Sequence, residues 1–88
     1  MIIEKKIWPE YFELIQKGEK SYDWRLANFK VDSGDILILK EWNPENNSFT
    51  GREIKKTVGY VGKVTKEYLD TFSNEDIEKY GFQIISLK

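Results

Sequence analysis

The sequence contains no cysteine and no histidine among its 88 residues. Without cysteine the chain can form neither a disulfide framework nor a thiolate metal site. Without histidine it lacks the side chain that most often serves as a general base and as a transition-metal ligand. No glycine-rich phosphate loop or catalytic triad is present either. We therefore expect no metal and no cofactor.

Long apolar runs and a large net charge are also missing. No run approaches the roughly 20 apolar residues that a membrane helix needs. Met1-Ile2-Ile3 is followed at once by charged residues, so we expect no signal peptide. The formal net charge of -1 denies the chain the global basic field of strong nucleic-acid binders, but it leaves local basic patches possible. We expect a cytoplasmic monomer with no membrane contact.

The residues that are present suit a small folded domain. The chain is 40% apolar and 15% aromatic, which is enough to bury a core and argues against disorder. A chain of 88 residues is near the size at which one core suffices. We therefore expect a single domain over residues 1–88.

The clearest local pattern predicts a helix that begins at Pro9 and ends before Gly18. Proline suits the first turn of a helix, and glycine commonly follows the last turn. Between them, apolar side chains recur at helical spacing. These are Tyr11, Phe12, Leu14 and Ile15.

The rest of the chain reads mainly as strands. β-prone segments cover residues 2–7, 19–25, 36–42, 52–66 and 82–87, and residues 43–48 form a hairpin loop. Residues 36–39 are continuously apolar, which predicts a strand buried on both faces. Gly59 and Gly62 predict a bend, and a short helix is expected to begin near residue 73. We expect an α+β fold, mainly β: a compact small barrel with helices at its ends. A flat α+β sheet is the alternative.

Asp23 and Arg25 are two residues apart on a predicted strand, so they share a face, about 6.5–7 Å apart along it. Pairing there would orient the guanidinium toward a phosphate or carboxyl ligand. A structural ion pair on a solvated face is the other reading. The opposite parity carries Tyr22 and Trp24, and we expect burial of Trp24 and exposure of Arg25.

Lys20 has the opposite strand parity to Asp23 and Arg25. It can join that pair only if the chain is still turning out of Gly18 at this point. A lysine with a lowered pKa can act as a base or a nucleophile. A solvated lysine is the alternative.

Charges are segregated in the second half of the chain. Residues 52–66 carry a net charge of +4, and residues 67–80 carry -4. The basic run, which begins at Arg52, can contact phosphates; the other possibility is that the two runs neutralise each other. Several aromatic side chains can either stack on bases or pack in the core. These are Trp24, Trp42, Phe49 and Tyr60.

Three segments together resemble the ASCH family. They are Trp8-Pro9-Glu10-Tyr11-Phe12, Gly18-Glu19-Lys20-Ser21-Tyr22-Asp23-Trp24-Arg25 and Gly34-Asp35-Ile36-Leu37. The family has a helix leading into a G-x-K-x-x-E-x-R motif, followed by a G-D-x-L strand. The later Glu41-Trp42-Asn43-Pro44 and Phe49-Thr50-Gly51-Arg52-Glu53 resemble a small bacterial and phage subgroup of unknown function.

The resemblance implies a PUA-like β-barrel, related to domains that bind RNA, with Lys20, Asp23 and Arg25 at a cleft. Asp23 stands where the family usually has glutamate. One branch of the family hydrolyses N4-acetylcytidine with a lysine, a threonine and a glutamate. Lys20 matches that lysine, but Asp23 occupies the threonine position.

We therefore expect a module that binds RNA, a nucleoside or a nucleotide. Its expected ligand-binding residues are Lys20, Asp23, Arg25 and Arg52. The first alternative is a small amidohydrolase acting on an acylated nucleoside, with Lys20 and Asp23 as catalytic residues. The second is a regulatory protein-interaction domain in which the motif is purely structural.

Overall fold

A computed structural model of the chain describes residues 1–64 and 75–88. The described elements follow one another as β1 (Ile2–Ile7), α1 (Pro9–Gln16), β2 (Tyr22–Leu26), β3 (Ile36–Asn43), β4 (Ser48–Val64), α2 (Glu75–Tyr80) and β5 (Phe82–Leu87). These elements confirm the predicted mixture of strands with a helix near each end. The expected start of the second helix, at residues 73–74, lies outside the described residues.

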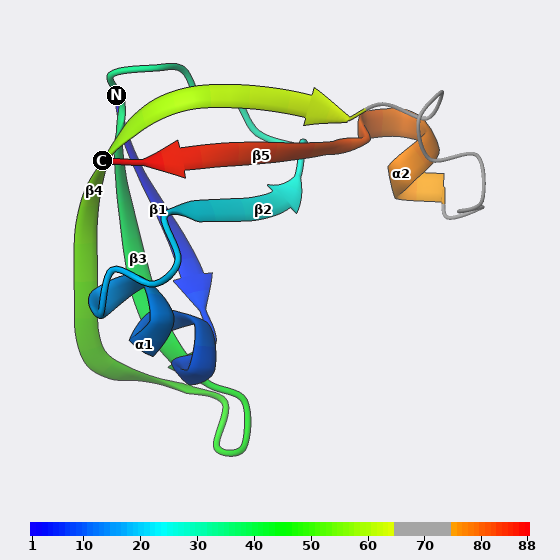
Figure 1. Cartoon of the computed structure of the whole chain (residues 1–88). Helices are drawn as coiled ribbons and strands as arrows, with labels where there is room; N and C mark the ends of the chain where they lie inside the picture. Colours follow the sequence, from blue (N-terminus) through cyan, green and yellow to red (C-terminus); the bar gives the residue numbers. More distant parts are fainter. Residues whose placement is uncertain (65–74) are drawn as a thin grey trace.

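The strands form one strongly curved sheet in the order β1-β3-β4-β5-β2. β1 runs parallel to β3, and the other neighbouring strands are antiparallel. β4 belongs to both halves of the sheet, because its first part pairs with β3 and its last part with β5 (Figure 1). Its register against β5 shifts between Val58 and Val61, where the chain bends. The bend predicted from Gly59 is therefore confirmed.

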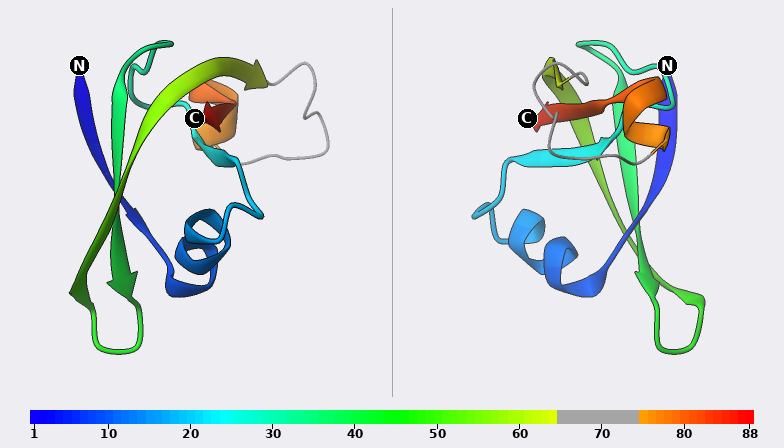
Figure 2. Two further views of the ribbon diagram at one scale, coloured as in Figure 1. Left: turned by 60° about the vertical axis from the view of Figure 1, so that its left-hand side comes forward. Right: turned by 90° about the vertical axis from the view of Figure 1, so that its right-hand side faces the viewer.

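The sheet does not close into the expected barrel. β1 and β2 are its two edges, and no backbone ladder joins them among the described residues. Instead, the Lys6 carbonyl of β1 accepts a 2.6 Å hydrogen bond from the Arg25 side chain of β2. Figure 2 shows the ribbons of β1 and β2 lying apart from each other. The fold is thus a rolled α+β sheet with one open seam.

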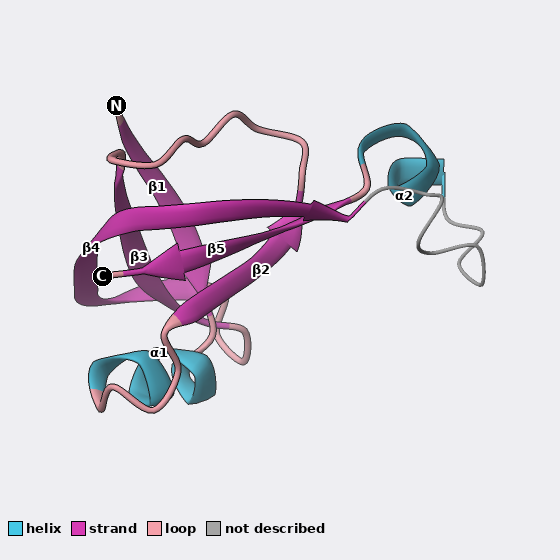
Figure 3. Cartoon of the chain, turned by 45° about the horizontal axis from the view of Figure 1, so that its top comes forward, coloured by secondary structure: helices cyan, strands magenta, loops and turns pink. Residues whose placement is uncertain are grey.

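The core lies inside the curve of the sheet. Leu37 and Leu39 of β3 are fully buried and Ile38 nearly so, which confirms the prediction of a strand buried on both faces. Helix α1 adds Phe12 and Ile15 to this core, and it lies beneath β2 in Figure 3. Helix α2 lies at the far end of β5, away from α1 (Figure 1). No helix in the described parts of the chain is long and apolar enough to cross a membrane.

The bend in β4 requires a residue without a side chain at position 59, which can be tested. A Cβ at this position would collide with the Ser86 hydroxyl oxygen, which accepts a 2.7 Å hydrogen bond from the Tyr60 N–H. Gly59→Ala should therefore lower the free energy of unfolding by about 1–3 kcal/mol, the usual cost of overpacking. Urea denaturation measures this change. The same substitution should cost less in a Ser86→Ala background, and an equal cost in both backgrounds would contradict the account.

Candidate functional site

A cavity of about 610 Å³ lies at the open seam between β1 and β2, beside the start of α1. It has the size of a small-ligand site. Its walls contain three of the four ligand-binding residues predicted from the sequence. Lys20, Asp23 and Arg25 all line it. The other lining residues are Lys6, Ile7, Trp8, Tyr11, Tyr22, Trp24, Leu26 and Phe82.

Lys20 reaches the cavity because the chain is still turning after α1. Gly18 has a φ of 80° and donates its N–H to Ile15, and the N–H groups of Glu19 and Lys20 both donate to Leu14. This arrangement is the Schellman ending of a helix. It delays the start of β2 to Tyr22, three residues later than the predicted start at Glu19. Lys20 therefore does not follow strand parity.

The Lys20 ammonium lies over two aromatic rings. Its Nζ is 4.5 Å from the centre of the Tyr11 ring and 5.2 Å from that of Tyr22. Such contacts stabilise the cation without neutralising it. The positive charge thus stays available at the cavity wall.

Asp23 and Arg25 point toward the inside of the sheet. The Arg25 Nε donates to the Asp23 carboxylate at 2.5 Å, and Nη2 donates to the Lys6 carbonyl at 2.6 Å. Asp23 is buried, whereas Trp24 is 56% exposed and packs edge-on against Phe82. The expected burial of Trp24 with exposure of Arg25 is therefore wrong. Arg25 neutralises the buried Asp23 carboxylate, so the strand face that carries these two charged residues can face inward.

Two basic residues near the Asp23–Arg25 pair, Lys5 and Lys6, could not be predicted as site residues from the sequence. Lys6 lines the cavity, and Lys5 lies 3.7 Å from the centre of the Phe29 ring. Burial and then the neighbouring Arg25 lower the pKa of Lys5, while Asp23 acts in the opposite direction. Their position at the end of β1, paired with β3, could be recognised only once the strands were placed. Both add positive charge at the seam.

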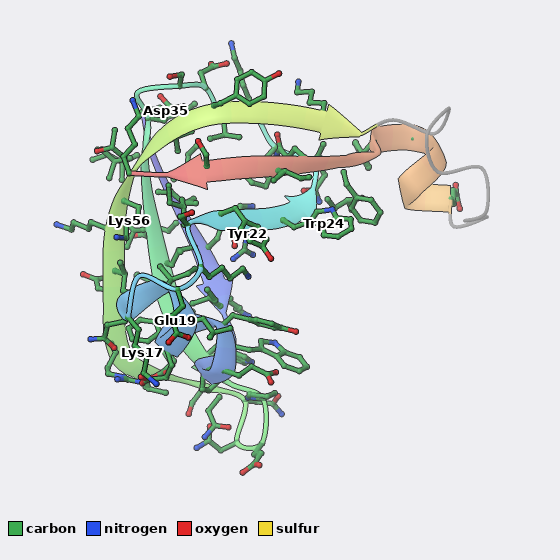
Figure 4. The ribbon with its side chains drawn as sticks, viewed as in Figure 1. Lys17, Glu19, Tyr22, Trp24, Asp35 and Lys56 are labelled. Atoms are coloured by element: carbon green, nitrogen blue, oxygen red, sulfur yellow. The ribbon has the colours of Figure 1, made fainter. Side chains whose placement is uncertain are left out.

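Four aromatic side chains surround the cavity and remain largely open to solvent. Trp8 is 52% exposed, Tyr11 45%, Tyr22 49% and Trp24 56%. Figure 4 shows Tyr22 and Trp24 along β2, above α1. Large aromatic side chains are mostly buried in folded proteins. A group of exposed ones that lie together marks a binding surface. Of these four side chains, only Trp24 is a stacking candidate predicted from the sequence.

Arg52 does not line this cavity. Its Nε and Nη2 donate to the two oxygens of the buried Glu41 carboxylate at 2.9 and 2.7 Å, and Nη2 also donates to Glu13 of α1 at 2.7 Å. The Thr50 hydroxyl donates to the same Glu41 carboxylate. The guanidinium thus joins the β3–β4 hairpin to α1. Arg52, predicted to bind ligand, therefore contacts α1 and β3 rather than the cavity.

For two of the other candidate aromatics the structure decides between the two predicted roles. Phe49 is 50% exposed and Tyr60 77% exposed, so neither packs in the core. Trp42 contacts Phe49 edge-on, with ring centres 4.9 Å apart.

Among the described residues no group of acidic side chains could hold a metal ion. Part of each charged run identified in the sequence, including Lys66, lies outside the described residues.

Comparisons with known proteins agree with this geometry only at the level of family and fold. Residues 2–73 match the model of DUF3850, a domain of unknown function, and the chain belongs to that family. Its fold resembles the crystal structure of the hypothetical protein PH0355 with a TM-score of 0.73 and 22% sequence identity, covering 100% of this chain and 98% of the other. At that identity the likeness concerns the fold alone.

A curated relative comes from a bacteriophage. The chain is 35% identical over 57 residues to the uncharacterised 12.9 kDa protein in the GpA 3' region of Escherichia phage P2. The match covers 65% of this chain and 50% of the phage protein. The chain therefore spans about half the length of the curated relative it matches. The expected place in the ASCH family stays a prediction.

The support around Glu41 gives a prediction for acid stability. The hydrogen bond from Arg52 lowers the pKa of Glu41 below its ordinary value of 4.5; burial acts against this, and the Thr50 hydroxyl adds to the lowering. A carboxyl whose folded pKa is lowered stabilises the fold above its unfolded pKa, and the contribution is lost as the pH falls through the folded pKa. Glu41→Gln should therefore destabilise the protein at neutral pH.

The difference between wild type and Glu41→Gln should shrink as the pH falls from about 6 to about 3. Urea denaturation at several pH values measures it. Asp35, whose pKa is also lowered, titrates in both proteins and so cancels in the comparison. A difference that stays constant with pH would show that the Glu41 carboxylate has no such role.

Proposed function

We propose that the cavity at the seam binds RNA or a nucleotide. The observation that carries this proposal is the convergence of four exposed aromatic rings and three cationic side chains, Lys6, Lys20 and Arg25, on one hollow. Aromatic rings offer stacking surfaces to bases, and cations attract phosphates. A small apolar substrate would need only the aromatic rings, and a simple anion would need only the cations.

Arg25 is the side chain best arranged for recognition. Asp23 and the Lys6 carbonyl hold Nε and Nη2, whereas Nη1 has no hydrogen-bond partner among the described residues. A guanidinium fixed in this way keeps donors in a set direction toward a phosphate or a base edge. Because its rotamer is already restrained, binding costs less side-chain entropy.

The charge around the cavity also suits an anionic ligand. Three cations, Lys6, Lys20 and Arg25, line the cavity together with one carboxylate, that of Asp23, which is paired with Arg25. The cavity thus carries a net charge of +2 on a chain whose formal net charge is -1. A local patch of this kind gives salt-dependent binding without a basic protein.

An amidohydrolase acting on an acylated nucleoside is supported by Lys20 and Asp23 lining the same cavity. In the described residues, however, no hydrogen bond or ion pair joins them, and Asp23 is engaged by Arg25. Within the part of the chain that the structure describes, Lys20 therefore has no acid–base partner in contact with it. The geometry favours binding over hydrolysis. A place for the family among ASCH-type, PUA-like domains is part of the same proposal.

Titration of the protein with short RNA, nucleoside monophosphates and free nucleosides at low salt tests the proposal, with tryptophan fluorescence as the readout. Trp24→Ala should weaken binding about ten-fold, within the usual worth of stacking on one base. Lys20→Ala should weaken binding and flatten its dependence on salt, because a phosphate contact is lost.

Lys55→Ala is the matched control for Lys20→Ala, since this exposed lysine of β4 lies outside the cavity. It should leave affinity unchanged. Absence of binding by every ligand at low salt, or an equal effect of the two lysine substitutions, would contradict the proposal. Incubation with N4-acetylcytidine tests the alternative: turnover by wild type that Lys20→Ala abolishes would establish the hydrolase instead.

A further inference from the structure

We infer that the site extends beyond the cavity to the aromatic pair Trp42–Phe49, and that its ligand is a single strand of several nucleotides rather than a free nucleotide. This inference rests on the proposed function. Trp42 and Phe49 face each other across β3 and β4 at the base of the hairpin, with ring centres 4.9 Å apart. Neither side chain belongs to the hydrophobic core.

Lys6 lies between the cavity and the Trp42–Phe49 pair. It lines the cavity, and its Nζ lies 3.9 Å from the centre of the Trp42 ring and 5.8 Å from that of Phe49. Within residues 1–64 and 75–88 it forms no ion pair. A strand leaving the cavity would meet this ammonium between two stacking surfaces.

Cations and aromatic rings therefore contact each other at both ends of this surface. At the cavity Lys20 lies over Tyr11 and Tyr22, and at the hairpin Lys6 lies over Trp42 and Phe49, while Lys6 and Lys20 line the same cavity. Cations set beside stacking surfaces at two successive places fit a polymer that has a base and a phosphate in each unit. Bases paired in a duplex do not expose their faces, so the arrangement favours a single strand.

The positive charge on this surface is that of Lys6. Lys40 is paired with Glu4 at 3.4 Å and has Glu53 as its cross-strand neighbour, so carboxylates balance its charge. Glu45 lies further along, in the hairpin loop. An acidic polymer is therefore complementary to the surface around Lys6, between the cavity and Trp42.

The hairpin is also held rigidly enough to serve as a platform. β3 and β4 change register between Lys40 and Trp42, and Gly51 has a φ of 96° in the opposing bulge. The bidentate pair of Arg52 with Glu41 fixes this bulge. Bulges often re-aim side chains next to functional sites. Here the bulge lies directly beside Trp42 and Phe49.

Comparison of a mononucleotide with a fluorescently labelled single-stranded RNA of about eight nucleotides tests the inference. Wild type should bind the longer ligand more tightly. Phe49→Ala should weaken RNA binding about ten-fold, as expected for loss of one stacked base, and leave mononucleotide affinity unchanged. Phe49→Leu, which keeps an apolar side chain against Trp42, should give the same loss.

Tyr60→Ala is the matched control, because Tyr60 is a more exposed aromatic residue that lines a different hollow. It should change neither affinity. Equal affinity of wild type for both ligands, or an equal loss for both ligands in Phe49→Ala, would overturn the extension while leaving the cavity proposal standing. Absence of binding by both ligands would overturn the cavity proposal itself.

Discussion

The bond network of Arg25 is the constraint on which the rest of the site depends. By donating to Asp23 within β2 and to the Lys6 carbonyl of β1, this guanidinium holds the two free edges of the sheet at a fixed separation. Without it, the buried Asp23 carboxylate would lose its ion-pair partner and the seam its only described cross-link. The cavity exists because the edges are bridged by a side chain rather than joined by a ladder.

A second charged cluster positions the other wall of the cavity. Arg52 ties Glu41 of β3 to Glu13 of α1 and lies 4.5 Å from the centre of the Phe12 ring. Helix α1 carries Tyr11, which borders the cavity, and its position decides where Lys20 emerges. The Arg25 cluster thus fixes the width of the seam, and the Arg52 cluster fixes the position of α1 beside it.

The sequence predicted the local elements well because each depended on neighbouring residues. Pro9 and Gly18 bound α1, and the apolar run at residues 36–39 became a buried strand. The open seam could not be predicted, because it depends on a contact between Lys6 and Arg25, which are distant in sequence. The same contact reversed the expected burial of Trp24 and Arg25. The ion pairs of Arg52 could not be predicted, because a basic residue that binds phosphate and one that binds carboxylates look alike in a sequence.

The central claim is that the seam between β1 and β2 receives a nucleic-acid ligand. The most direct measurement is a ¹H–¹⁵N NMR titration of the protein with single-stranded RNA, following the indole N–H signals of Trp8, Trp24 and Trp42 together with the backbone signals. The account predicts that all three indole signals shift along with the backbone of residues 6–8 and 20–26, while Lys30 and Tyr60 stay unchanged. Shifts confined to Lys30, Tyr60 and their neighbours, or no shifts at all, would contradict it.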